Sequence, residues 1–369
     1  MQEEQLIESI DKLLLEALSK RASDIHFEPY QNSYRIRMRI DGVLQEMLSP
    51  PLFLAKQIVA RLKIMAKLDI AEQRLPQDGQ LVIDNYAMRI ATLPVMNGEK
   101  VVLRVMDNHE TQLSLYDLGL TEQNLSIFQQ ILAQPQGLVL VTGPTGSGKT
   151  ITLYSGLKML NQSYRNICSV EDPIEIPLEG INQTAVNMKS GLSFSVILRA
   201  LLRQDPDVMM IGEIRDRETA EIAIQAAQTG HLVLSTLHTN SSIEGVTRLN
   251  QMGIENYLLS SCLKLVIAQR LVRKLCPYCK LAASELIMFG QEPSPHFIAT
   301  GCSHCIGGYL GRIGIYEFLL VTREIQNQIL NKQAISPSNM ITLKEAGQKL
   351  VIEGVTSLAE LHRVLGDLI

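Results

Sequence analysis

The chain has 369 residues, which is too long for a single small hydrophobic core, so about two or three domains are expected. Apolar residues make up 46% and charged residues 20% of the sequence, which is typical of a soluble globular protein and argues against disorder, collagen and a disulfide scaffold. With 34 Lys and Arg against 38 Asp and Glu, the net charge of −4 indicates no broad nucleic-acid surface.

The beginning of the sequence predicts a helix and not a targeting segment. Leu6, Ile10, Leu14 and Leu18 recur on one helical face, and the basic and small-residue pattern of a signal peptide is missing. No stretch approaches the ~18 apolar residues of a membrane span. Six cysteines in such a chain favour a reducing compartment, so we expect a cytoplasmic protein with no transmembrane segment.

Residues 1–107 are expected to form a small α/β domain. Tyr34 to Leu44 alternates polar and apolar residues with a DG turn, as a half-exposed strand does, and Leu52 to Ile70 has helical spacing. A turn at Pro76 to Gly79 and further strands follow. The polar stretch 108–121 is interpreted as a linker.

The rest of the chain is expected to hold an α/β core at 122–275, a four-cysteine element at 276–305 and a helical subdomain at 306–369. The core is predicted from short apolar runs that alternate with helical segments, which indicates a sheet covered on both faces. These runs are 137–143, 166–172, 207–213 and 231–238.

The sequence GPTGSGKT fits the phosphate-binding pattern G-x-x-x-x-G-K-[ST], and it follows an apolar strand and precedes a helix. Its glycines let backbone N–H groups curve around phosphate oxygens, Lys149 can reach the β- and γ-phosphates, and Thr150 can hold Mg²⁺. A chance glycine-rich turn or a decayed site is the alternative. The candidate nucleotide-binding residues are Gly143, Pro144, Thr145, Gly146, Ser147, Gly148, Lys149 and Thr150.

Acids and histidines flank other strands of the same predicted sheet. Glu213 ends one strand, where it can orient or deprotonate the attacking water, Glu171 ends another, and His231 and His238 flank a third. A single acid at a strand end is often only a cap or a surface charge, and a single histidine is often structural. Their joint occurrence at one sheet favours catalysis.

These motifs, in this order, resemble the Walker A motif, aspartate box, Walker B motif and histidine box of the type II/type IV secretion ATPase superfamily. The resemblance is closest to type IV pilus assembly and type II secretion ATPases. It implies a RecA-like P-loop core preceded by a smaller, PAS-like α/β domain, and larger members carry a further N-terminal domain. It also implies that Glu213 is the key Walker B carboxylate, that Glu171 supports metal and water positioning, and that His231 and His238 sense the γ-phosphate.

Two arginines are candidates for contacting the γ-phosphate. Phosphoryl transfer needs positive charge on the developing phosphate, although a single strand arginine is more often part of a solvated face. The resemblance implies homo-hexamers whose N-terminal domain closes over nucleotide. Arg89, in MRIATLP, and Arg104, in EKVVLRVMD, match the family's phosphate-reaching arginines.

Four cysteines form two CxxC pairs with 22 residues between them. Two such knuckles can complete a closed Cys₄ zinc site, and a disulfide or a thioredoxin-like motif fits this chain less well. The expected zinc ligands are Cys276, Cys279, Cys302 and Cys305. In the family this element belongs to assembly and secretion ATPases, and retraction ATPases lack it.

The leading hypothesis is therefore a hexameric ATPase, using ATP, Mg²⁺ and structural Zn²⁺, that powers assembly of a pilus or secretion pseudopilus. The resemblance implies an inner-membrane platform protein as partner and a cytoplasmic location at the inner membrane. A nucleic-acid motor, DNA-uptake or recombinase-like ATPase is the rival, although charge and aromatic content disfavour a nucleic-acid partner. The third hypothesis is a nucleotide-dependent switch that binds the nucleotide but does not hydrolyse it.

Overall fold

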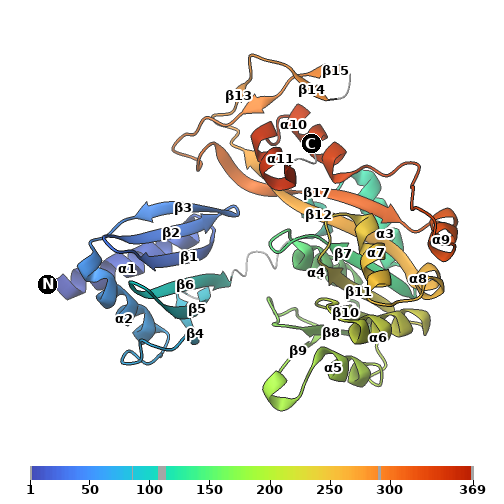
Figure 1. The fold of residues 1–369 in the computed structure, drawn as a ribbon, viewed down its shortest axis with the longest axis horizontal. Coiled ribbons are helices and arrows are strands. Elements are labelled where there is room, and N and C mark those ends of the chain that lie inside the picture. The colour runs from blue at the N-terminus through green and yellow to red at the C-terminus, as the bar shows by residue number, and fades with distance from the viewer. Residues whose placement is uncertain (1, 85, 107–113, 290–291, 367–369) are drawn as a thin grey trace. The chain divides into compact units, whose positions relative to one another are not determined.

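The structure, a computed structural model, describes residues 2–84, 86–106, 114–289 and 292–366 (Figure 1). The chain forms two compact units, Met1–Gln112 and Leu113–Ile369. Of the expected linker 108–121, residues 108–113 lie outside the described part. Residues 114–121 belong to the second unit, because Leu115 and Leu118 are buried in its core.

The first unit is a six-stranded antiparallel sheet in the order β3-β2-β1-β6-β5-β4, with helices α1 and α2 on one face. In β2 the residues Tyr34, Ile36, Met38 and Ile40 are buried, and the residues between them face the other side, as a period of two requires. The elements are α1 (Gln2–Ser19), β1 (Ala22–Pro29), β2 (Tyr34–Ile40), β3 (Val43–Leu48), η1 (Leu52–Leu54), α2 (Ala55–Met65), β4 (Gln77–Ile83), β5 (Tyr86–Val95) and β6 (Gly98–Met106).

Two details of this unit differ from the sequence-based prediction. The segment Tyr34 to Leu44 belongs to a hairpin of two strands, joined at Asp41 and Gly42, which have φ of 48° and 83°. The expected turn at Pro76 to Gly79 is wrong, because Gln77 to Gly79 begin β4 and pair with β5. Local turn propensity is overridden there by strand pairing, and Gly79 is suited because a Cβ would lie 2.8 Å from Leu68.

The second unit is a seven-stranded sheet in the order β17-β12-β7-β11-β10-β8-β9, parallel except for β17. Both faces are covered, since Leu138 and Leu140 of β7 enter one core and Val139 and Val141 enter the other. The elements to β12 are η3 (Leu115–Leu118), α3 (Glu122–Leu132), β7 (Gly137–Thr142), α4 (Lys149–Leu160), β8 (Ile167–Glu171), β9 (Asn182–Ala185), η4 (Met188–Ser190), α5 (Phe194–Leu201), β10 (Val208–Ile211), α6 (Arg217–Gln228), β11 (Leu232–Leu237), α7 (Ser242–Gln251), α8 (Asn256–Cys262) and β12 (Leu263–Leu275).

The C-terminal part adds a strand to this sheet before its helices begin. Residues 306–369 were expected to be helical, but β17 (Tyr309–Leu320) pairs along β12. Interspersed glycines hide its strand pattern, and its apolar residues are buried only beside β12. The other elements are β13 (Leu281–Ala282), β14 (Ile287–Phe289), β15 (Glu292–Ser294), β16 (Phe297–Ile298), α9 (Arg323–Leu330), α10 (Leu343–Ile352) and α11 (Leu358–Leu365). Among the described residues, every helix is too short or too polar to cross a bilayer.

Candidate nucleotide site

The expected phosphate loop connects β7 to α4, at the edge of the sheet where the parallel strands end. Gly143, Gly146 and Gly148 have positive φ, and a Cβ on Gly143 would lie 2.5 Å from the carbonyl oxygen of Gln269. The loop can follow this path only with glycine at that position. Ser147 Oγ is buried and has no hydrogen-bond partner in the described part of the chain. Its hydroxyl could therefore donate a hydrogen bond to an oxygen of a bound ligand.

Lys149 is folded over this loop at the first position of α4. Its Nζ donates to the carbonyl oxygens of Gly143 at 2.8 Å and Pro144 at 3.0 Å. Burial lowers the pKa of Lys149 to about 8, and the negative charge of Glu213 acts against that shift. The ammonium is therefore short of counter-charge, and phosphate oxygens would supply it.

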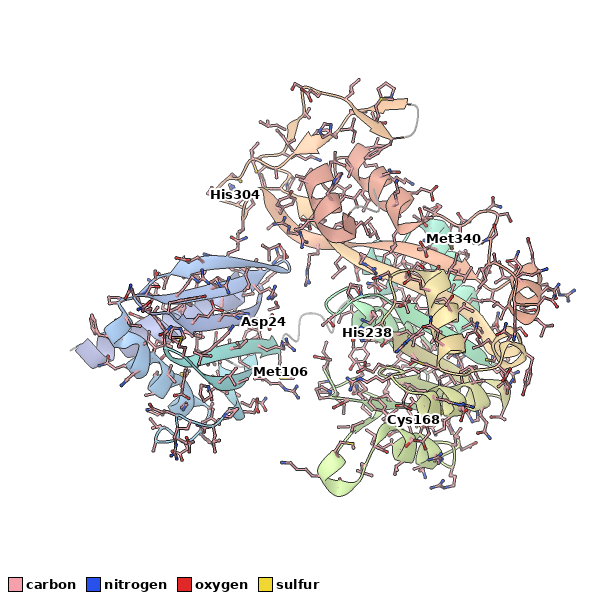
Figure 2. The ribbon with its side chains drawn as sticks, in the orientation of Figure 1. Asp24, Met106, Cys168, His238, His304 and Met340 are labelled. Atoms are coloured by element: carbon pink, nitrogen blue, oxygen red, sulfur yellow. The ribbon has the colours of Figure 1, made fainter. Side chains whose placement is uncertain are left out.

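Glu213, just beyond β10, lies between two cationic or ionisable partners. Its carboxylate pairs with the Arg215 guanidinium, and its Oε2 lies 3.4 Å from Nε2 of His238. Arg215 also lies 3.8 Å from Oδ2 of Asp172, so the aspartate box reaches Glu213 through this arginine. Burial, then the charge of Lys149, lowers the pKa of His238, which favours a neutral imidazole at pH 7. His238 lies at the edge where β11 ends (Figure 2).

Among the described residues, the Glu171 side chain forms no hydrogen bond or ion pair with Glu213, Arg215 or His238. It is buried, and its carboxylate accepts hydrogen bonds from the hydroxyl of Tyr154, from Ser169 Oγ at 2.6 Å and from Gln183 Nε2 at 3.0 Å. Burial, followed by the hydrogen bond to Glu171, raises the pKa of Tyr154. These contacts anchor α4 and β9 to β8, which differs from the expected metal- and water-positioning role.

His231 lies at the wrong end of its strand for a phosphate sensor in this subunit's site. It precedes β11, its backbone carbonyl accepts from Gly137 N at the start of β7, and its Nδ1 lies 2.9 Å from the carbonyl oxygen of Ala226. The six residues of β11 separate it from the loop edge by ~20 Å at the usual rise per residue. These contacts do not place His231 beside the phosphate loop of its own subunit.

Sequence reasoning missed two residues that support the phosphate loop from β12. Gln269 accepts from Thr152 Oγ1 of α4 at 2.8 Å. The neighbouring Arg270 is buried and donates to the carbonyl oxygens of Gln269 and Asn240, each at 3.0 Å. The polar pair Gln-Arg interrupting the apolar run LVIA…LV was the available signal.

In the first unit, the candidate arginines lie on one strand pair. Arg89 and Arg104 are register partners on β5 and β6, and both side chains are exposed. Arg104 Nε donates to Oδ1 of Asp24 at 3.0 Å. The structure therefore brings the two arginines together on the face away from the helices of this unit.

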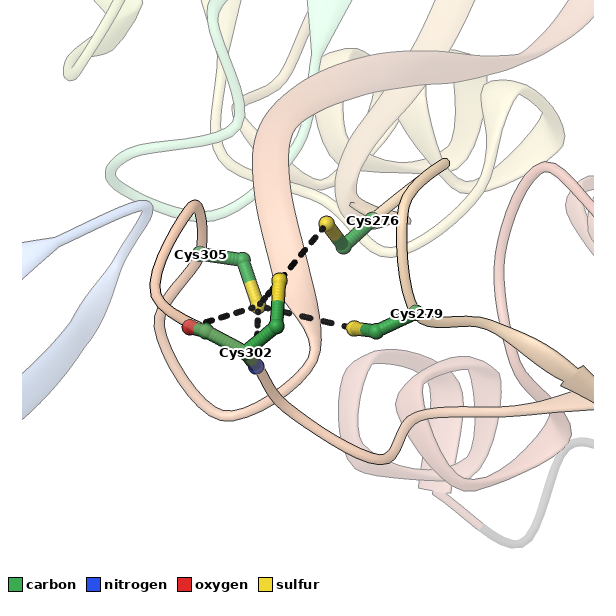
Figure 3. A group of neighbouring side chains, drawn as sticks. All are labelled: Cys276, Cys279, Cys302 and Cys305. Atoms are coloured by element: carbon green, nitrogen blue, oxygen red, sulfur yellow. Dashed lines mark hydrogen bonds between the residues drawn. The ribbon is translucent and has the colours of Figure 1, made fainter.

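The four candidate zinc ligands lie together in the second unit (Figure 3). Their Sγ atoms are all within 4.8 Å of one another, and the 276–302 and 279–305 pairs are 3.8 and 3.7 Å apart. A tetrahedron with Zn–S bonds of ~2.3 Å has edges of ~3.8 Å. The cluster thus fits zinc and is too wide for disulfides. The other two cysteines, Cys168 and Cys262, are buried elsewhere.

Comparison with known proteins agrees with this geometry. Residues 1–363 match the family described as Type II/IV secretion system protein. The chain is 53% identical to the protein transport protein HofB homolog of Escherichia coli K12, covering 97% of this chain and 81% of that protein. It is 49% identical to the type II secretion system ATPase E of Vibrio cholerae, covering 97% and 75%.

Two further likenesses bear on the fold and on the family. The chain is 46% identical to the type IV pilus assembly ATPase PilB of Acinetobacter baylyi, and the alignment covers 98% of this chain and 66% of that protein. The crystal structure of the pilus retraction motor PilT with bound ADP superposes with a TM-score of 0.63 at 27% identity, covering 96% of each chain. The α/β fold is therefore that of these ATPases, and the chain belongs to the type II/IV secretion system protein family.

Proposed function

We propose that this chain hydrolyses ATP and that the hydrolysis powers assembly of a type IV pilus or a type II secretion pseudopilus. The observation that carries the proposal is the convergence of Lys149, Glu213 and His238 at one sheet edge, in a chain about half identical to assembly and secretion ATPases. A second function has no observation in its favour, because no basic stripe or aromatic platform marks a nucleic-acid motor in the sequence.

Each residue of the site would have a distinct task. Backbone N–H groups of the loop 143–148 and the Lys149 ammonium bind the phosphates. Glu213 orients the attacking water or accepts its proton, and neutral His238 donates or accepts a hydrogen bond beside it. Mg²⁺, held through the Thr150 hydroxyl, would neutralise charge on the β- and γ-phosphates.

The arginines of the first unit would complete the site in an assembled ring. Arg89 and Arg104 present exposed guanidinium groups on one strand pair, and such groups are suited to stabilise charge on a transferred phosphoryl group. We propose a homo-hexamer in which this unit closes over nucleotide, so that hydrolysis releases the closure and moves the domains. The moving ring would act on an inner-membrane platform protein from the cytoplasmic side.

Structural zinc would occupy the cysteine cluster, where it stabilises the fold of residues 276–305 without an open coordination position. The cluster supports assembly or secretion over retraction, by the family pattern. The choice between pilus and secretion pseudopilus depends on the partner that the ring engages.

The test is ATP turnover per subunit, measured with Mg²⁺ over a range of protein concentrations, with light scattering on the same samples. We expect turnover to rise as the hexamer forms. Glu213→Gln should lower kcat at least ~100-fold while ATP still binds. Full turnover by a monomer would contradict the ring, and unchanged turnover in the variant would contradict the catalytic role of Glu213. ATP binding with no turnover above background in either protein would favour a nucleotide switch, and strong stimulation by single-stranded DNA would favour the nucleic-acid motor.

A further inference from the structure

Glu317, on β17, holds the first residues of two helices that belong to different parts of the second unit. Its Oε1 accepts hydrogen bonds from the backbone N–H of Ser242 at 2.8 Å and from Ser242 Oγ at 2.6 Å. The backbone N–H of Leu343 donates to its Oε2 at 3.3 Å. Ser242 begins α7 and Leu343 begins α10, and Glu317 itself is only 5% exposed.

The first N–H groups of a helix lack partners within the helix and carry partial positive charge. A buried carboxylate is stable there because these donors replace the water it has lost. The nearby Arg270 adds to this balance: burial lowers the pKa of Arg270, and the negative charges of Glu317 and Glu244 act against that shift. The Glu317 carboxylate is therefore part of the junction itself, because the first residues of both α7 and α10 donate hydrogen bonds to it.

The segment 239–242, between β11 and α7, is fixed at both ends. At one end, Thr239 N donates to Thr142 Oγ1 at 2.9 Å, immediately before the phosphate loop. In the middle, Arg270 donates to the Asn240 carbonyl oxygen at 3.0 Å. At the other end, Ser242 is held by Glu317. His238, whose Nε2 lies 3.4 Å from Glu213, directly precedes this segment.

We infer that Glu317 is a positioning residue for ATP hydrolysis: by fixing the start of α7 it holds segment 239–242, and thereby His238, against Glu213. Because the same carboxylate binds the start of α10, the position of the C-terminal helices is coupled to the geometry of the nucleotide site. Met340, just before α10, supports this junction with its Sδ 3.5 Å from Ser242 Oγ (Figure 2). This inference rests on the proposed ATP hydrolysis.

The test compares Glu317→Gln with Glu360→Gln in the full chain. A glutamine at 317 places an NH₂ donor against the N–H of one helix, so that one helix start loses its acceptor, and the other keeps only a neutral carbonyl oxygen, which accepts more weakly than a carboxylate. Glu360 is a matched control, because it is also buried in the C-terminal part but binds Arg273 and Arg363. ATP turnover, Mg-ATP affinity, thermal stability and hydrogen–deuterium exchange are measured for both variants.

We expect Glu317→Gln to lower kcat ~10-fold with the Kd for Mg-ATP changed less than ~2-fold, and Glu360→Gln to lower the melting temperature without that loss of kcat. Exchange should rise in peptides covering 239–246 and 343–346 of the first variant only. Equal losses of kcat in both variants, or a parallel loss of Mg-ATP affinity, would overturn the positioning role.

A lack of turnover in the unsubstituted chain would contradict the proposed function separately. In that case the exchange measurement decides alone whether Glu317 joins the two segments. Faster exchange in both segments supports the junction, and faster exchange in one or neither overturns it.

Discussion

Arg89 and Arg104 face each other across strands β5 and β6 as direct register partners. Like charges in this position destabilise a sheet, so the pair needs counter-charge. Asp24 supplies it to Arg104, whereas no carboxylate in the described part of the chain lies within ion-pair distance of Arg89. A phosphate group would complete the neutralisation, which is why the pair is suited to a transferred phosphoryl group.

Replacing either arginine with alanine should therefore reduce kcat strongly in the assembled protein. We expect a loss of ~100-fold for Arg89→Ala and Arg104→Ala at saturating ATP, with nucleotide binding by the dissociated chain unchanged. Arg74→Ala is the control, because Arg74 is exposed on the same unit and already pairs with Glu72. A loss as large in the control would mean that general surface charge, and not this pair, supports turnover.

The sequence predicted which elements reach the nucleotide site but not which way each side chain points. The apolar runs at 137–143 and 207–213 formed the buried strands β7 and β10 as expected, because their length and composition allow little else in a covered sheet. The contacts of Glu171 and His231 could not be predicted, because being next to a strand does not decide which end or face a side chain takes. That depends on pairing register and on donors such as Tyr154, which lie far away in sequence.

The C-terminal part was misjudged for a related reason. The glycines of GYLGRIGIYEF interrupt both helical and strand periodicity, so β17 becomes recognisable only when β12 is beside it. The pairing of β12 with β7, which is also long-range in sequence, brings Gln269 and Arg270 under the phosphate loop. Neither residue belongs to a local motif, so both could be found only from the fold.

Glu171→Gln tests whether its contacts define its role. The carboxylate accepts from Tyr154, Ser169 and Gln183, and an amide would oppose one of these donors. We expect the free energy of unfolding to fall by ~1–3 kcal/mol, with kcat at 20 °C changed less than ~3-fold. Urea denaturation and a turnover assay on the same preparation measure both. A large loss of kcat with unchanged stability would restore the metal- and water-positioning role.

Removing zinc should unfold the cysteine element while leaving the phosphate loop intact. The element is linked to the C-terminal part by Cys276 N, which donates to Gly308 O, and by Lys280 Nζ, which donates to Gly354 O at 2.7 Å. After chelation, we expect a thiol reagent to label the four clustered cysteines but not the buried Cys168 and Cys262. Mg-ATP binding, followed by calorimetry, should persist, and its loss on mild chelation would contradict this independence.

The affinity for ATP should weaken as pH rises through the pKa of Lys149. Burial lowers that pKa to about 8 in the free protein, whereas bound phosphate stabilises the ammonium and raises it. Binding therefore takes up a proton above pH 8, so Kd should increase toward ~10-fold per pH unit between about pH 8.5 and 9.5 and level off below about pH 7.5. Calorimetry with Mg-ATP in buffers of different ionisation enthalpy measures both the Kd and the proton uptake.

The control for this pH dependence is Lys149→Met, which removes the titrating group from the loop and keeps an unbranched side chain. Its binding should be weaker at neutral pH, because the charge that attracts phosphate is gone, and nearly independent of pH above 8. His238 cannot supply the dependence, since its pKa is lowered from 6.5 and the imidazole is already neutral in this range. A pH slope that persists in the methionine variant would assign the proton to another group and leave Lys149 charged throughout.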